Sequence, residues 1–167
     1  MIARKLMLLG EIGVGKSSLA RRLVFDKFEF DYKPTIGVDV YRYEVPDVPG
    51  RQQMSLIIWD TDGNFGDAIF RHIYMKEAAG ALIIADVSRA ATLDAMKKLG
   101  EGFADAFPGR HVGYVLNKSD LLDAEQPALP SFLTSPALSV IKTSAKTGSY
   151  VQDAFTDAAD AIARRSA

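Results

Sequence analysis

Residues 10–17 read Gly10-Glu11-Ile12-Gly13-Val14-Gly15-Lys16-Ser17, and this stretch decides the fold. It matches the pattern G-x-x-x-x-G-K-[ST], in which glycines let successive backbone N–H groups face a pyrophosphate. The apolar run Lys5–Leu9 before it has the pattern of a buried strand, and helical periodicity begins at Lys16. Because the motif requires this order of strand, loop and helix, it predicts a phosphate site in which Lys16 balances the β- and γ-phosphates and Ser17 binds Mg²⁺.

The rest of the chain alternates between apolar runs typical of strands and segments with helical periodicity. The further strands are expected at Val38–Val45, Met54–Trp59, Ala81–Ala85, Val112–Leu116 and Leu138–Ile141. Helices are expected over about Ala91–Phe107 and over a last segment with Val151, Phe155, Ala158 and Ile162 on one face. A Pro/Gly turn at 46–50 suits an antiparallel hairpin. This order predicts an α/β P-loop NTPase fold: a mostly parallel sheet of about six strands, one of them antiparallel, flanked by about five helices.

The overall composition is that of an ordinary globular protein. The 167 residues are the usual length of one domain, with 48% hydrophobic and 25% charged residues. Lys and Arg number 20 and Asp and Glu number 21, so the formal net charge is −1. We therefore expect no broad basic surface for nucleic acid or an anionic membrane, and a polyanionic ligand needs a local site.

The cysteine count is zero, which excludes disulfides, thiolate zinc sites, catalytic cysteines, palmitoylation and prenylation of this chain. The longest apolar stretch, Ala78–Ala85, is far shorter than the roughly 20 residues that span a bilayer. The N-terminal apolar run stops at Gly10-Glu11 and lacks the form of a signal peptide. The expectation is a cytoplasmic protein without a direct lipid anchor.

A second polar motif, Asn117-Lys118-Ser119-Asp120, follows the expected strand Val112–Leu116. Ligands of such sheets bind where the parallel strands end, so this motif is placed to select the base of a nucleotide. The Asp120 carboxylate can accept hydrogen bonds from the N1–H and the 2-amino group of guanine, whereas adenine presents no such pair of donors. The motif therefore favours guanine.

With three further motifs, these residues resemble the small GTPases of the Ras superfamily, and most closely the Rab branch. The additional motifs are Pro34-Thr35-Ile36-Gly37, Trp59-Asp60-Thr61-Asp62-Gly63 and Thr143-Ser144-Ala145-Lys146. All five occur in the order and at the spacing of the family, and the likeness covers nearly the whole chain. It implies that residues 1–167 form a single Ras-like GTP-binding domain.

The resemblance implies a contact for each matching position. The phosphates are expected to bind main-chain N–H groups of Gly13, Val14, Gly15, Lys16, Ser17 and Ser18, and the N–H of Gly63. Phe28 is expected to stack on guanine, with core packing as its alternative role, while Tyr32, Pro34 and Thr35 close over the triphosphate. The base pocket is implied for Asn117, Lys118, Asp120, Ser144, Ala145 and Lys146, and the Mg²⁺ site for Ser17, Thr35 and, through water, Asp60.

The second switch departs from the family pattern Asp-Thr-Ala-Gly-Gln-Glu, since residues 60–65 read Asp-Thr-Asp-Gly-Asn-Phe. Asn64 carries the amide of the usual Gln on a stem one methylene shorter, and a misplacement of about 1 Å can cost on the order of 100-fold in rate. Asp62 either repels the triphosphate or holds the attacking water instead. Ile12 replaces a glycine of Ras proteins near the entry of an arginine finger. The candidate catalytic residues are Lys16, Thr35, Gly63, Asn64 and Asp62.

The leading hypothesis is a Mg²⁺-dependent GTP-binding switch with slow GTP hydrolysis. It would cycle between GTP and GDP states to control an effector, and exchange factors and GTPase-activating proteins would bind its switch regions. The alternative is a guanine-nucleotide-binding module with negligible hydrolysis, a pseudo-GTPase or scaffold, which Asn64, Asp62 and Ile12 favour. Another P-loop enzyme, such as a kinase, is a weaker third hypothesis.

Overall fold

The computed structural model describes residues 1–26, 38–61, 77–121 and 129–165. The elements follow in the order β1 (Ile2–Leu9), α1 (Lys16–Phe25), β2 (Val38–Glu44), β3 (Met54–Thr61), β4 (Ala78–Asp86), α3 (Ala90–Ala106), β5 (His111–Asn117), η2 (Ser119–Leu121), η3 (Ser131–Thr134), β6 (Ser139–Lys142) and α4 (Val151–Arg165). The described residues thus hold three α-helices and two short 3₁₀ helices, compared with the roughly five helices expected from the sequence.

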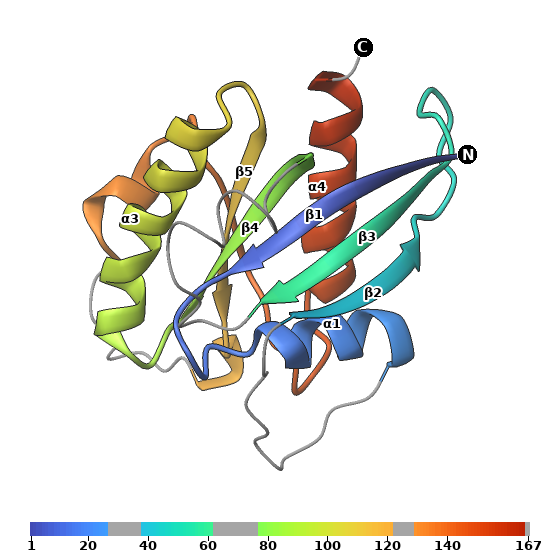
Figure 1. The fold of residues 1–167 in the computed structure, drawn as a ribbon. Coiled ribbons are helices and arrows are strands. Elements are labelled where there is room, and N and C mark those ends of the chain that lie inside the picture. The colour runs from blue at the N-terminus through green and yellow to red at the C-terminus, as the bar shows by residue number, and fades with distance from the viewer. Residues whose placement is uncertain (27–37, 62–76, 122–128, 166–167) are drawn as a thin grey trace.

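The strands form one sheet in the order β2-β3-β1-β4-β5-β6 (Figure 1). Only β2 runs antiparallel to its neighbour, through the expected hairpin with β3, and the other pairs are parallel. Such crossovers of strand, helix and strand place helices on both faces of a sheet. The predicted α/β class and the mostly parallel six-stranded sheet are confirmed.

The two faces of the sheet have separate cores, and β1 contributes to both by simple alternation. Leu6 and Leu8 pack on the face covered by α1 and α4, together with Leu19 and Phe155. Met7 and Leu9 face the side covered by α3. Because side chains alternate along a strand, a strand buried on both faces is apolar throughout, which explains the unbroken apolar run in β1.

Polar residues extend three strands beyond their apolar runs. The strands β3, β4 and β5 continue through Thr61, Asp86 and Asn117, where the expected strands stop at Trp59, Ala85 and Leu116. Their backbones still pair with the neighbouring strands, so hydrophobic pattern alone underestimates their length. These ends meet along one side of the sheet, here called the carboxyl edge, and the opposite side, where the strands begin, is the amino edge.

The chain leaves β1 at the carboxyl edge through Gly10. A Cβ at this position would collide with the carbonyl oxygen of Ile84 in β4. Only glycine lets the loop cross the neighbouring strand so closely. The crossing brings residues 10–15 over the carboxyl edge and starts α1 at Lys16. Within the described parts of the chain, no helix is long and apolar enough to cross a membrane.

Candidate functional site

The loop between β1 and α1 surrounds the side chain of Lys16, the first residue of α1. Lys16 is buried, and its Nζ donates to the carbonyl oxygens of Gly10 and Glu11, at 2.8 and 3.1 Å. Gly13 and Gly15 have φ values of +80° and +102°, in the left-handed region that favours glycine. The motif glycines are therefore required by the backbone that the loop adopts.

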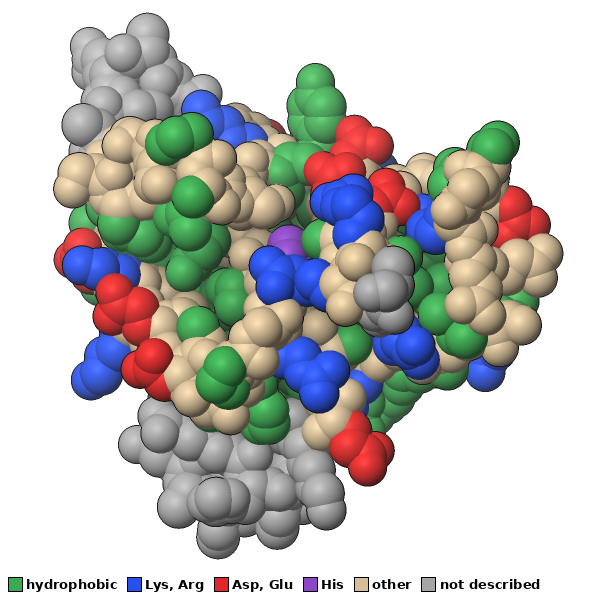
Figure 2. Space-filling view, turned by 90° about the horizontal axis from the view of Figure 1, so that it is seen from above, with side chains coloured by type: hydrophobic (Ala, Val, Ile, Leu, Met, Phe, Trp, Pro, Cys, Tyr) green, Lys and Arg blue, Asp and Glu red, His purple; other side chains and the backbone are tan. Residues whose placement is uncertain are grey.

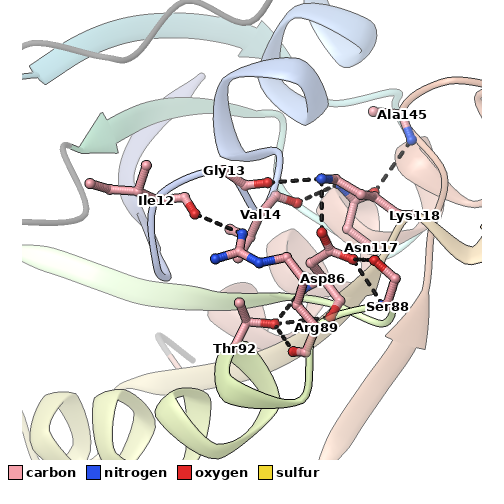
Figure 3. Close-up of polar contacts among 10 residues, drawn as sticks. All are labelled: Ile12, Gly13, Val14, Asp86, Ser88, Arg89, Thr92, Asn117, Lys118 and Ala145. Carbon is pink, nitrogen blue, oxygen red and sulfur yellow. Dashed lines mark hydrogen bonds and ion pairs between the residues drawn. The ribbon is translucent and has the colours of Figure 1, made fainter.

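Side chains from distant segments hold the outer carbonyl oxygens of this loop (Figure 3). Arg89 Nη1 donates to the Ile12 oxygen, Lys118 Nζ to that of Gly13, and Asn117 Nδ2 to that of Val14, each at 2.9 Å. In a trans peptide the N–H points away from the C=O of the same unit. The outward carbonyls therefore turn the N–H groups of Gly13 and Gly15 to the other side of the loop, where the start of α1 adds its own N–H groups.

Ser17 and Asp60 lie together, as a shared metal site requires. The Ser17 hydroxyl donates to Oδ2 of Asp60, although the two residues are 43 positions apart in the sequence. Asp60 is fully buried at the end of β3, and Thr61 Oγ1 fixes this end by donating to the carbonyl oxygen of Leu8 at 2.8 Å. A hydroxyl beside a buried carboxylate is a set of hard oxygen donors, which suits Mg²⁺. The residues present therefore fit the predicted metal.

The loops after β5 and β6 form one unit around Asn117. Its Oδ1 accepts hydrogen bonds from Thr143 Oγ1 at 3.1 Å and from the N–H of Ala145 at 3.4 Å. Ser144 Oγ donates to Oδ1 of Asp120 at 2.8 Å. Asp120 itself is exposed, in the short helix η2. The structure thus brings the two predicted base-pocket motifs together and orients the Asp120 carboxylate.

Lys118 connects this unit to the phosphate loop and to the end of β4. Its Nζ forms an ion pair with Oδ2 of the buried Asp86 at 2.8 Å, in addition to its bond to Gly13. Burial raises the pKa of Asp86, but hydrogen bonds from Lys118 and Ser88, together with the Lys118 charge, outweigh it and hold the pKa below its ordinary value. Asp86 is therefore ionised at neutral pH and keeps Lys118 in place.

Two residues of this network, Asp86 and Arg89, were not among the candidates from the sequence. The available signal was the position of Asp86, directly after the apolar run of β4 at the carboxyl edge, where Asp60 and Asn117 also lie. Arg89 directly precedes α3 as its N-cap residue and carries no comparable sequence pattern. Its contact with the loop depends on the packing of segments 77 residues apart.

The predicted site residues divide into two groups. The described ones at the carboxyl edge are Gly13, Val14, Gly15, Lys16, Ser17, Ser18, Asp60, Asn117, Lys118, Asp120, Ser144, Ala145 and Lys146, the last being exposed. The candidates Phe28, Tyr32, Pro34, Thr35, Asp62, Gly63 and Asn64 lie outside the described residues. The roles of all these residues toward a ligand stay predictions.

Comparisons with known proteins cover nearly the whole chain. The model of the Ras family matches residues 5–164. The Ras-related protein RABF2a of Arabidopsis thaliana is 32% identical over 167 residues, which cover 98% of this chain and 82% of the relative. RABA6a of the same plant is 37% identical over 155 residues, or 90% of this chain and 66% of the relative.

A shorter match is to the Ras-related protein Rab-32 of Mus musculus, which is 38% identical over 94 residues, or 56% of this chain and 42% of that protein. The family model nevertheless spans nearly the whole chain, and the fold and the phosphate loop are those that the sequence motifs predict. The chain therefore belongs to the Ras family and is a Rab-like small GTPase, one of the GTP-binding proteins.

Proposed function

We propose that this protein is a Mg²⁺-dependent switch that binds GTP, hydrolyses it slowly, and controls an effector through the conformation of its two switch segments. The observation that carries the proposal is the phosphate loop, whose outer carbonyls are held by Arg89, Lys118 and Asn117. This arrangement leaves inner N–H groups to bind phosphate oxygens. Regulators such as exchange factors and GTPase-activating proteins would act at the switches.

The chain's own residues account for phosphate and metal binding. Gly13 and Gly15 would offer N–H groups to the phosphates, and Lys16 would neutralise their charge from the loop interior. Ser17 and Asp60 would hold Mg²⁺, with Thr35 as a further ligand from the first switch. When bound, the metal neutralises charge on the β- and γ-phosphates. The contact between Ser17 and Asp60 supports this assignment because it places both oxygen donors beside the first turn of α1.

Base selection would rest on Asp120. Ser144 holds one oxygen of its carboxylate, which orients the group as an acceptor for the N1–H and 2-amino donors of guanine. Removing the carboxylate in Asp120→Ala should lower the affinity for GDP by about 100-fold or more, because two charged hydrogen bonds contribute about 1.5–3 kcal/mol each. A fluorescent-nucleotide titration against GDP and ADP measures this. Asp105→Ala, which removes an exposed carboxylate near the end of α3, is the matched control and should bind GDP as the parent does.

Hydrolysis would proceed by attack of water on the γ-phosphorus, with release of phosphate and retention of GDP. Asn64 is proposed to orient this water with a reach shorter than that of Gln, which makes the reaction slow. Single-turnover release of phosphate from protein loaded with GTP and Mg²⁺ tests the proposal, and Asn64→Gln should raise the rate. An unchanged rate in this variant would show that the reach of Asn64 is not limiting.

The alternative, a nucleotide-binding module with negligible hydrolysis, is favoured by one observation. Ile12 is 39% exposed on the phosphate loop, where its branched side chain would obstruct an arginine finger supplied by an activating protein. No release of phosphate over many hours, from protein that retains GTP, would support this alternative and contradict the switch.

A further inference from the structure

Five successive carbonyl oxygens of the phosphate loop each accept a hydrogen bond from a side chain. Lys16 binds those of Gly10 and Glu11, and the next three are bound by Arg89, Lys118 and Asn117 in turn. Lys16, Asn117 and Lys118 belong to the two nucleotide motifs of the sequence. Arg89 belongs to none of them, yet it occupies an equivalent place in the set. Its position suggests a role toward the loop rather than toward its own helix.

The segment that carries Arg89 is fixed at both of its ends. The Arg89 N–H donates to the Asp86 carbonyl at 3.0 Å. Thr92 Oγ1 lies 2.9 Å from that same carbonyl and 2.7 Å from the carbonyl of Arg89. The Asp86 carboxylate in turn binds Lys118 and Ser88 (Figure 3). Asp86 therefore links two supports of the loop. Its carbonyl oxygen holds the segment of Arg89, and its carboxylate holds Lys118, which binds the carbonyl oxygen of Gly13.

The guanidinium of Arg89 contacts one peptide unit of the loop, Ile12–Gly13. It donates to the oxygen of this unit at 2.9 Å, so the N–H of Gly13 must point to the inner side of the loop. A Cβ at Gly13 would lie 3.2 Å from Nη1 of Arg89, and φ at Gly13 is +80°. Glycine thus permits the close approach of the arginine. Because Gly13 has no side chain, the Ile12–Gly13 peptide would be free to rotate without this hydrogen bond.

We propose that Arg89 is a positioning residue of the nucleotide site, which holds the Ile12–Gly13 peptide so that the Gly13 N–H faces a phosphate and thereby slows nucleotide release. The inference rests on the GTP-binding function proposed above. Arg89 is exposed, so salt and water screen its charge toward a distant phosphate. Arg89 therefore acts on the site through its hydrogen bond to the loop, whose donor is a planar and permanently charged guanidinium.

The test compares the release of fluorescent GDP, in the presence of Mg²⁺, from four proteins: the parent chain, Arg89→Ala, Arg89→Lys and Arg110→Ala. Arg89→Ala should release GDP about 10-fold faster, the lower end expected for loss of a charged hydrogen bond at an exposed site. Arg89→Lys keeps a charged donor and should stay within about threefold of the parent. Arg110→Ala removes another exposed arginine, one that lies at the amino edge, and should leave the rate unchanged.

A second measurement separates positioning from a general structural role. The urea midpoint of each protein, stripped of nucleotide with a chelator, should be the same for Arg89→Ala and Arg110→Ala. The inference is overturned if Arg89→Ala releases GDP at the rate of Arg110→Ala, or if its faster release comes with a lower urea midpoint and is not restored by lysine. If the parent protein itself retains neither GDP nor GTP, the proposed function fails and the role of Arg89 fails with it.

Discussion

The carboxyl edge and the amino edge of the sheet differ in how their polar and charged side chains are arranged. At the carboxyl edge, buried Lys16, Asp60, Asp86 and Asn117 are each bonded to other residues of the protein. At the amino edge, basic side chains gather around a histidine and a hollow of about 680 Å³ (Figure 2). Arg4, Lys5, Arg110 and Arg165 line this hollow together with one acid, Glu77.

The difference predicts that nucleotide binding depends on the carboxyl edge of the sheet and not on the amino edge. Buried polar groups at the carboxyl edge fix the loops, which is the preorganisation that a binding site needs. At the amino edge, His111 is buried, and its surroundings disfavour the protonated form of its side chain. Burial, and then the charges of Arg165 and Arg164, lower its pKa to about 4. Changes at the carboxyl edge should therefore alter nucleotide binding, whereas changes at the amino edge should alter stability alone.

The largest effect is expected from Gly15→Ala at the carboxyl edge. An alanine at φ +102° is strained, and its methyl group would collide with the amide of Asn117, which binds Val14, Thr143 and Ala145. Strain and lost hydrogen bonds together should lower the free energy of unfolding by roughly 3–5 kcal/mol. Urea unfolding and GDP release check this, and release should become too fast to retain the nucleotide.

Gly109→Ala is the matched control at the amino edge. Gly109 has a φ of +82°, but among the residues that the structure describes, none beyond its chain neighbours comes within 4 Å of a Cβ placed there. Only backbone strain remains, so the free energy of unfolding should fall by about 1–2 kcal/mol, with GDP release unchanged. Equal losses in the two variants would contradict the collision with Asn117.

An effect of intermediate size is expected when the pH is lowered. His111 has a folded pKa of about 4 against an ordinary value of 6.5, so the unfolded chain binds its proton first as the pH falls. The stability contributed by the neutral histidine is complete above pH 6.5 and is lost between pH 6.5 and 4, by about 3 kcal/mol. Urea midpoints measured across this range should show the decrease.

The variant His111→Gln isolates this contribution from those of carboxylates such as Asp157, whose pKa is raised by burial and by neighbouring acids. Its unfolding free energy should depend less steeply on pH between 6.5 and 4. Asp86 does not contribute in this window, because its lowered pKa means that its stabilisation is lost only below its ordinary range. A slope equal to that of the parent would show that His111 is not the group that titrates.

The smallest effect is expected from Arg51→Ala, in the turn between β2 and β3 at the amino edge. Arg51 is mostly buried and binds Asp160 of α4 and the carbonyl of Pro46. Its loss should lower the free energy of unfolding by about 1–2 kcal/mol, while GDP release stays within about twofold of the parent. Arg42→Ala, which breaks an exposed ion pair with Glu44 and a hydrogen bond to Ser55, is the control and should lower the free energy of unfolding less than Arg51→Ala does. Faster GDP release from Arg51→Ala would contradict the independence of the two edges.

Features set by local sequence were predicted well. The phosphate loop and the β2–β3 hairpin follow from glycine, proline and apolar patterns, and the structure contains both. The polar strand ends Asp86 and Asn117 lie one residue beyond the expected strands, since an apolar pattern cannot follow a strand into polar residues. The role of Arg89 depends on contacts across 77 residues, which a local pattern does not encode. The switch residues, among them Thr35 and Asn64, stay predictions.

The outward carbonyls of the phosphate loop also bear on whether this loop can be transplanted. Its eight-residue motif supplies the inward N–H groups and one lysine, but three of its carbonyls rely on Arg89, Asn117 and Lys118. Grafted alone onto another α/β sheet, the motif would lack the external supports that set its shape. A working graft would have to carry the ends of β4 and β5 with it, so the smallest transferable unit is the carboxyl edge rather than the motif.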